Sequence, residues 1–122
     1  MRQKKLRPVE WLGSSREDVK AFPARVQDHL GFALYQAQAG LKHRNAKALK
    51  GLGPGVLEVV SRHDGDTYRG VYTVRFKAAV YVLHAFQKKA KRGPATPKRE
   101  IELIERRLRV AEQHYEATYG KG

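Results

Sequence analysis

Two β-type runs on either side of an Asp-Gly turn are the feature that most constrains the fold. VLEVVSR at residues 56–62 and TYRGVYTVRF at residues 67–76 are rich in β-branched and aromatic residues, and HDGD stands between them. Asp-Gly between two such runs predicts a β-hairpin, because a tight hairpin turn requires residues that tolerate positive φ. After a second short connection at Lys77 and Ala78, AVYVLHAFQ continues at residues 79–87. The sequence therefore predicts three consecutive antiparallel strands, with residues 67–76 in the central one.

Helical patterns precede these strands. Ser14 and Ser15 are closely followed by acidic residues, which favours a helix start at this point. Residues 23–39 repeat apolar side chains at helical spacing, and Gly40 is a typical C-terminal cap. Pro23 either begins a second helix or kinks a single one. The first half of the chain therefore offers a helical hairpin with one apolar face.

The remaining segments complete an α+β pattern. Residues 4–12, KKLRPVEWL, are expected to form a short edge strand, because proline cannot donate to a ladder. Residues 41–55 are basic and glycine-rich without a sustained period, which is typical of a loop. Thr96 is expected to cap a C-terminal amphipathic helix that has Pro97 at its first position. We therefore expect a single domain over residues 1–122, with an antiparallel sheet, an N-terminal helical hairpin and a C-terminal helix.

Positive charge is the strongest indication of a partner. The 122-residue chain has 25 Lys and Arg against 12 Asp and Glu, a formal net charge of +13. A polyanion, most commonly nucleic acid, is the first partner to expect, although an acidic protein or simple solubility would also be compatible with this charge. No acidic residue stands between Asp66 and Glu100, or between Asp28 and Glu58. Because stretches of one charge sign repel themselves in a folded protein, a binding surface is favoured.

Several chemistries lack the residues that they need. The chain has no cysteine, and its 5 histidines show neither HxH nor HExxH spacing, so we expect no metal site. There is no P-loop or dinucleotide motif, and we expect no cofactor. No apolar run approaches the roughly 18 residues of a membrane span, and the N-terminal segment does not have the apolar stretch of a signal peptide. A cytoplasmic protein without membrane contact is therefore expected.

Basic residues converge at one end of the predicted sheet. Arg69 is near the start of the central strand, and Lys88 and Lys89 are at the end of the next one. Antiparallel pairing brings these two ends together, and Arg62 arrives on the first hairpin strand. For Arg69, a phosphate-binding role and a structural ion pair are equally compatible with the pattern. For Arg75, an ion pair or a solvent-facing position is favoured.

Such a cluster suits the cleavage of RNA without a metal ion. The 2′-hydroxyl attacks the adjacent phosphorus, fixed positive charge stabilises the extra negative charge, and another group moves protons. Arginine and lysine can supply the first role. His63, a lysine or a tyrosine could supply the second, and the sequence leaves these alternatives open. We expect further RNA contacts from other basic residues of the acid-free stretches, namely Lys47, Lys50, Lys91, Arg92, Lys98 and Arg99.

The segments TYRGVY, VYVLHAFQKK and TPKREIELIERRL, in this order of elements, resemble the RelE/HigB superfamily of toxins from type II toxin–antitoxin systems, in particular its phage-derived HigB-like branch. The resemblance implies a small α+β RelE-like fold and an endoribonuclease that cleaves mRNA, often on the ribosome, and so inhibits translation. It also implies neutralisation by a cognate antitoxin, usually a helix-turn-helix protein encoded beside the toxin.

The resemblance also implies roles for particular residues. The family arginine of the YRxxY strand falls on Arg69, the basic residue after the last strand falls on Lys88 or Lys89, and a basic position on the first hairpin strand falls near Arg62. One departure concerns proton transfer, since some relatives have a catalytic tyrosine just after the last strand, whereas KAKRGPATP occupies that place here. ParE-type toxins share the fold but poison DNA gyrase. A gyrase inhibitor and a non-catalytic basic nucleic-acid-binding module are therefore the alternative functions.

Overall fold

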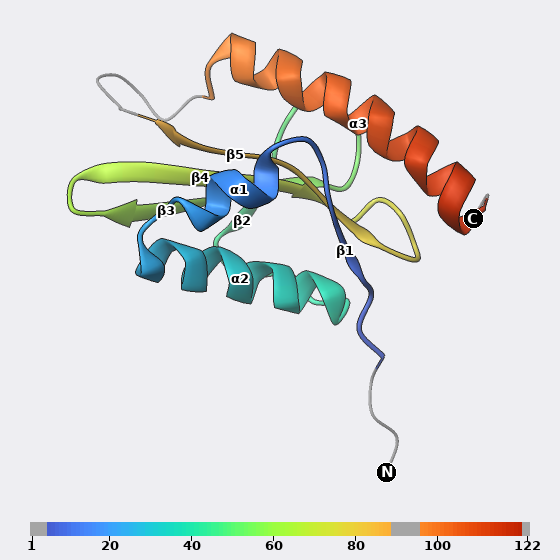
Figure 1. Cartoon of the computed structure of the whole chain (residues 1–122), viewed down its shortest axis with the longest axis horizontal. Coiled ribbons are helices and arrows are strands. Elements are labelled where there is room, and N and C mark those ends of the chain that lie inside the picture. The colour runs from blue at the N-terminus through green and yellow to red at the C-terminus, as the bar shows by residue number, and fades with distance from the viewer. Residues whose placement is uncertain (1–4, 89–95, 121–122) are drawn as a thin grey trace.

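The computed structural model describes residues 5–88 and 96–120, and this part of the chain forms a mixed α+β fold (Figure 1). Its elements in chain order are β1 (Val9–Trp11), α1 (Ser15–Lys20), α2 (Ala24–Gln38), β2 (Ala46–Ala48), β3 (Val56–His63), β4 (Asp66–Thr73), β5 (Val80–Lys88) and α3 (Lys98–Tyr119). The predicted fold class, a sheet with an N-terminal helical hairpin and a C-terminal helix, is confirmed. Among the described residues, no helix combines the length and the apolar character that crossing a membrane requires.

The sheet has the strand order β1-β5-β4-β3-β2, with β4 at its centre. β3, β4 and β5 pair antiparallel, as the two short connections predicted. The edge strands differ from the prediction. β1 pairs parallel with β5, because most of the chain separates the two strands and no tight turn forces them to be antiparallel. β2 forms inside the segment that was predicted as a loop, and pairs with β3. Its sequence, AKA, contains no residue with a strand preference.

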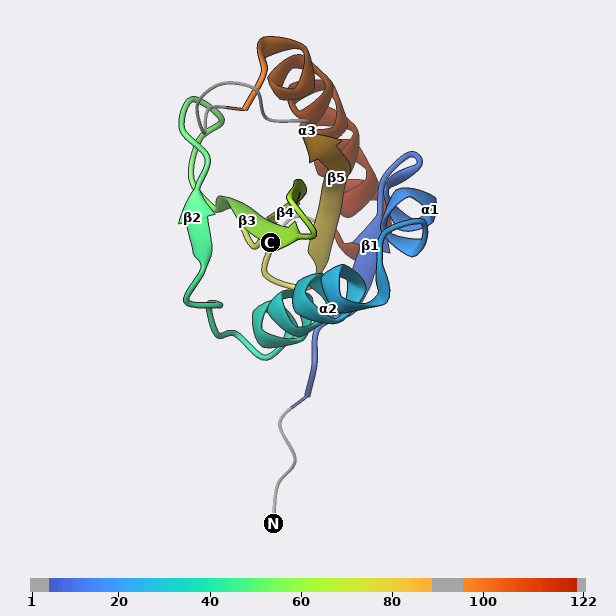
Figure 2. The ribbon, with the colours of Figure 1, turned by 90° about the vertical axis from the view of Figure 1, so that its left-hand side faces the viewer.

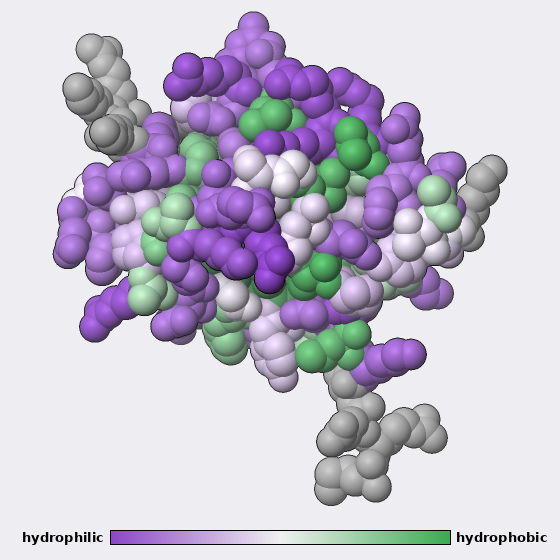
Figure 3. All heavy atoms as spheres, in the orientation of Figure 1, coloured by the Kyte–Doolittle hydropathy of each residue, from purple (hydrophilic) through white to green (hydrophobic). Residues whose placement is uncertain are grey.

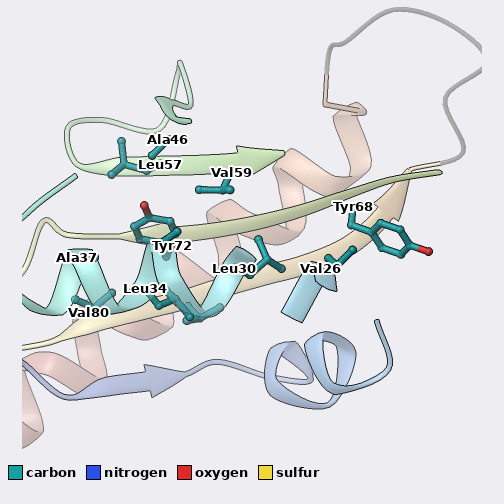
Figure 4. Packing of buried hydrophobic residues seen from close by; sticks show 12 residues of the cluster. Val26, Leu30, Leu34, Ala37, Ala46, Leu57, Val59, Tyr68, Tyr72 and Val80 are labelled. Atoms are coloured by element: carbon teal, nitrogen blue, oxygen red, sulfur yellow. The ribbon is translucent and has the colours of Figure 1, made fainter. Parts of the chain in front are cut away.

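Helices α2 and α3 cover opposite faces of the sheet (Figures 1 and 2). On the α2 face, Leu30 and Leu34 share a core with Tyr68 and Tyr72 of β4 (Figure 4). Gly70 lies between the two tyrosines in the chain, and a Cβ atom at this position would come within 3.0 Å of Leu30 Cδ2. The glycine of TYRGVY therefore lets α2 approach the central strand.

On the other face, α3 closes a second core over β4 and β5. Two tyrosines help to hold the C-terminal half of this helix. Tyr81 Oη lies 2.6 Å from His114 Nδ1, and the amide of Ala78 donates a hydrogen bond of 3.0 Å to the hydroxyl of Tyr115. Burial raises the pKa of Tyr81 to about 12. The outer surface of α3, at the top of Figure 3, is covered mostly by hydrophilic side chains.

The N-terminal end of α3 differs from the prediction in one respect. Pro97 is the N-cap, and the helix begins at Lys98. Thr96 makes no capping bond; its hydroxyl donates to Glu58 Oε2 on β3 at 2.7 Å. A hydrogen bond to a carboxylate is stronger than one to a neutral backbone group, which explains why Thr96 turns to the sheet. Pro23 is likewise the N-cap of α2, so the N-terminal half contains two helices instead of one kinked helix.

Candidate functional site

Three cross-strand rows on the α3 face make up what we call the basic end of the sheet. The rows are Arg62–Thr67–Lys88, Val60–Arg69–Phe86 and Glu58–Val71–His84. Directly paired residues of neighbouring strands point to the same face, and Val71 belongs to the core under α3. The structure therefore brings Arg62, Arg69 and Lys88 to one end of one face, as the predicted pairing requires.

Arg69 is held in an ion pair inside this end of the sheet. Its Nη1 lies 2.9 Å from Glu58 Oε1, and the two side chains are only 6% and 11% exposed. The other oxygen of Glu58 accepts the hydrogen bond from Thr96. The sequence interpretation named an anionic partner for Arg69 as one of two alternatives but did not identify Glu58. The sequence pattern that drew attention to Arg69 also holds for Glu58, because Glu58 is a charged residue between apolar neighbours on a strand.

An open groove of about 370 Å³ lies where β5 ends and α3 begins. Phe86, Gln87 and Lys88 line it from β5, and Pro97, Arg99 and Glu100 line it from the start of α3. Arg69 is 5% exposed and does not line the groove, but it pairs across the strands with Phe86, which does. Two cations and a carboxylate therefore face one hollow, which suits a ligand that carries negative charge and hydroxyl groups.

A β-bulge aims His84 into this region. The register of β4 and β5 changes from Val71↔His84 to Tyr72↔Val82, so that both Leu83 and His84 face α3. Regular alternation would have placed these two consecutive residues on opposite faces. A bulge has no sequence signature in LHAF, and the sequence interpretation accordingly placed His84 only as a residue packed in the sheet.

His84 links the groove to the middle of α3. Its Nε2 lies 2.8 Å from Glu100 Oε1, its Nδ1 lies 3.5 Å from Nη1 of Arg107, and its ring stacks on Phe86 with centroids 4.8 Å apart. A guanidinium has only donors, so Nδ1 is the acceptor and Nε2 carries the proton that is donated to Glu100. Burial lowers the pKa of Arg107, whose Nη1 also donates to the carbonyl of Leu83 at 3.0 Å.

The other predicted site residues are more scattered. His63 lies on the α2 face by strand alternation, opposite Arg62 and Arg69, and its Nε2 is 3.3 Å from Asp64 Oδ2. Lys47 is exposed on β2 and pairs with Glu58, so it extends one row of the basic end by a further strand, and Lys50 is exposed beyond it. Exposed positions in the first turn of α3 are occupied by Lys98 and Arg99. Three predicted positions, Lys89, Lys91 and Arg92, lie outside the described residues.

Arg75 has the structural role that the sequence favoured for it. Its Nη2 donates to the carbonyl of Leu52 at 2.6 Å and its Nε donates to that of Pro54 at 2.9 Å. Its Nη1 is also 3.8 Å from a carboxylate oxygen of Glu112 on α3. Arg75 therefore fastens the glycine-rich segment before β3. It lies beyond the end of β4, away from the hairpin turn.

The residues described by the structure contain no group of three or more His, Asp or Glu side chains placed to bind a metal ion. Residues 17–109 match the protein family described as "Phage derived protein Gp49-like (DUF891)". The chain belongs to this family. No curated protein matches the chain.

The fold is shared with a solved toxin structure. A mutant of the Escherichia coli toxin RelE in the free state has 17% sequence identity, and the superposition covers 86% of this chain and 97% of RelE with a TM-score of 0.57. The toxin–antitoxin complex RelBE2 from Mycobacterium tuberculosis has 18% identity, with 72% of this chain and 98% of the other covered and a TM-score of 0.46. The resemblance stated from TYRGVY and LHAFQKK is confirmed, since this member of a phage-derived family has the fold of RelE.

Proposed function

We propose that this chain is the toxin of a type II toxin–antitoxin system and that it cleaves mRNA on the ribosome without a metal ion, so that translation stops. The observation that carries the proposal is the grouping of Arg62, Arg69 and Lys88 on one face at one end of the sheet, beside an open groove. The phage-derived family and the fold shared with the toxin RelE support the assignment as a toxin.

The three basic residues would have different tasks. Arg62 is exposed and Lys88 is partly exposed, so both can contact phosphate oxygens directly. Arg69 is buried and fixed by Glu58, so it would supply positive potential from beneath the groove without having to reorganise. Preorganised charge of this kind stabilises the extra negative charge that develops when the 2′-hydroxyl oxygen bonds to phosphorus. Lys47, Lys50, Lys98 and Arg99 are exposed at positions where they could hold the flanking nucleotides.

We also propose an antitoxin as the protein partner, in the form of a helix-turn-helix protein encoded beside this chain. A toxin of this kind needs such a partner in the cell that makes it. The family resemblance supports this part of the proposal, and the net charge of +13 would favour an acidic segment in the partner.

The test uses the purified protein, ribosomes and a defined mRNA. Discrete cuts, mapped by primer extension, are expected from the wild-type protein. Arg62→Ala combined with Lys88→Ala should lower the cleavage rate by about 100-fold or more, because two contacts to the reacting phosphate are lost. In cells, the same double variant should relieve growth arrest as effectively as co-expression of the neighbouring reading frame.

The matched control is Lys77→Ala. Lys77 is an exposed lysine in the connection between β4 and β5, at the opposite end of the sheet from the hairpin turn, and its removal should leave the rate unchanged. Intact mRNA together with inhibited DNA supercoiling would identify a gyrase inhibitor instead. RNA binding without cleavage or growth arrest would identify a basic binding module.

A further inference from the structure

We propose that Glu100 is the proton acceptor of the groove and that His84 is the residue that positions its carboxylate. The inference rests on the proposed cleavage of RNA and names the group that activates the 2′-hydroxyl. Neither residue was singled out for this role from the sequence, where Glu100 was only the first acidic residue after a basic stretch.

Glu100 combines access to the groove with a fixed orientation. It lines the groove together with Lys88 and Arg99, and its side chain is 21% exposed. Within the described residues, its hydrogen bond is made through Oε1, to His84. The second carboxylate oxygen is therefore left for a hydroxyl group of a ligand. A general base must come within hydrogen-bond reach of the proton that it removes, and Glu100 is the carboxylate that lines this groove.

The position of His84 is a second, independent observation that favours a functional role for the carboxylate of Glu100. Its side chain is only 8% exposed, and the bulge in β5 turns it from the regular alternation toward Glu100. Phe86 covers one side of the ring, and Arg107 contacts Nδ1, which leaves the Nε2 proton for the carboxylate. Burying an imidazole and a guanidinium costs desolvation that an apolar pair would avoid. Buried polar chains of this kind cluster at functional sites, where they orient a reacting group.

The charges that surround Glu100 suit the chemistry. Lys88 faces it from β5 and Arg99 flanks it on α3, so a phosphate drawn to these cations would place its sugar beside the carboxylate. His84 lies beneath it, and the ion pair of Arg69 and Glu58 occupies the neighbouring strands.

The step balances as an internal transesterification. Glu100 takes the proton of the 2′-hydroxyl, the 2′-oxygen forms a bond to the adjacent phosphorus, and the bond from phosphorus to the 5′-oxygen breaks. The products are a 2′,3′-cyclic phosphate and a 5′-hydroxyl. Water protonates the departing 5′-oxygen, and the proton held by Glu100 returns to solvent, so no proton is consumed overall. No oxidant, reductant or further reactant is needed.

The experiment compares Glu100→Gln with the wild-type protein in single-turnover cleavage of a ribosome-bound mRNA across a range of pH. The amide keeps the shape and the hydrogen bond from His84 but cannot accept the proton. The rate should fall by about 100-fold or more, the range typical for loss of a general base. The fall of the wild-type rate at low pH should also vanish, whereas RNA affinity should change by less than about twofold. Glu102→Gln, which removes an exposed carboxylate two residues further along α3, is the matched control and should behave as wild type.

The positioning role of His84 has its own readout. His84→Leu removes the donor to Glu100, whereas His84→Gln can still present an N–H group to it. We expect His84→Leu to lower the single-turnover rate at least about tenfold without changing RNA affinity, and His84→Gln to recover most of that loss. Thermal unfolding of each variant separates this effect from a loss of fold.

The outcomes distinguish the two levels of the proposal. A wild-type protein that leaves mRNA intact would reject the proposed function, and this inference with it. Cleavage that is abolished by Arg62→Ala with Lys88→Ala but retained, with the same pH profile, by Glu100→Gln would reject Glu100 alone. If Glu100→Gln does not fold, Glu100→Ala tests the same point, because it removes the carboxylate, and a wild-type rate and pH profile for it would contradict the assignment.

Discussion

Arg69 and Glu58 show what a single residue pattern can and cannot predict. A charged residue between apolar neighbours on a strand needs a partner of opposite charge, and this requirement was visible in the sequence. The identity of the partner depends on the register, which places Glu58 one row away from Arg69 on the same face. A slip of one residue would turn Glu58 to the other face. The sequence could therefore place Arg69 near the site but could not decide between a carboxylate and a phosphate.

Removing one partner of the ion pair between Arg69 and Glu58 should lower stability much more than replacing both partners with apolar residues. Glu58→Gln leaves a buried guanidinium without the charge that faces it, and we expect the free energy of unfolding to fall by about 3 kcal/mol. Urea unfolding followed by circular dichroism measures this change. Arg69→Met together with Glu58→Leu should recover most of the stability, because an apolar pair avoids the desolvation cost. A Glu58→Gln variant as stable as wild type would show that Arg69 does not depend on this carboxylate.

At the scale of elements, local sequence patterns were sufficient to predict the main helices and strands, but they did not predict the contacts between elements. The three meander strands and the helices followed from alternation, helical spacing and the Asp-Gly turn. β2 and the bulge at His84 arise from pairing with a neighbouring strand, so the conformational preferences of their own residues do not predict them. Thr96 had the right residue type for a cap, but a tertiary hydrogen bond to Glu58 competes for its hydroxyl. The groove lies between the end of β5 and the start of α3, so its shape depends on how the helix packs on the sheet.

Gly70 and Gly31 give a matched test of how α2 packs on the sheet. A Cβ atom at Gly70 would meet Leu30 Cδ2 at 3.0 Å, whereas one at Gly31 on α2 would have nothing within 4 Å. Gly70→Val should therefore push α2 from β4 and lower the free energy of unfolding by about 1–3 kcal/mol. Gly31→Ala should raise it by about 1 kcal/mol or less, because alanine favours the helix. Thermal and urea unfolding measure both variants, and equal effects at the two sites would contradict the close approach at Gly70.

At the scale of the whole molecule, the two faces of the sheet have separate tasks. The α2 face is an apolar core built around Tyr68, Tyr72 and Leu30, and it holds the central strand in place. The α3 face carries a second core toward the C-terminal half of the helix, and near the start of the helix it gives way to the charged rows of the basic end. The site thus lies where a helix begins to cover a sheet that is fixed from behind. This arrangement lets charged residues be both partly buried and firmly positioned.

The net charge of +13 makes RNA affinity alone a poor reporter of where RNA binds, because a strongly basic protein attracts any polyanion. The salt dependence of binding is more informative, since each contact with a single-stranded phosphate adds about 0.7 to the slope of log affinity against log salt. Fluorescence anisotropy with a short single-stranded RNA should therefore show a slope reduced by about 0.7 for Arg62→Ala and again for Lys88→Ala, and an unchanged slope for Lys77→Ala. Glu100→Gln should keep the wild-type slope, because its proposed role is in the reaction and not in the capture of phosphate. An equal reduction for Lys77→Ala would mean that the RNA is bound by the overall positive charge of the protein, and this result would contradict the basic end of the sheet as the binding site.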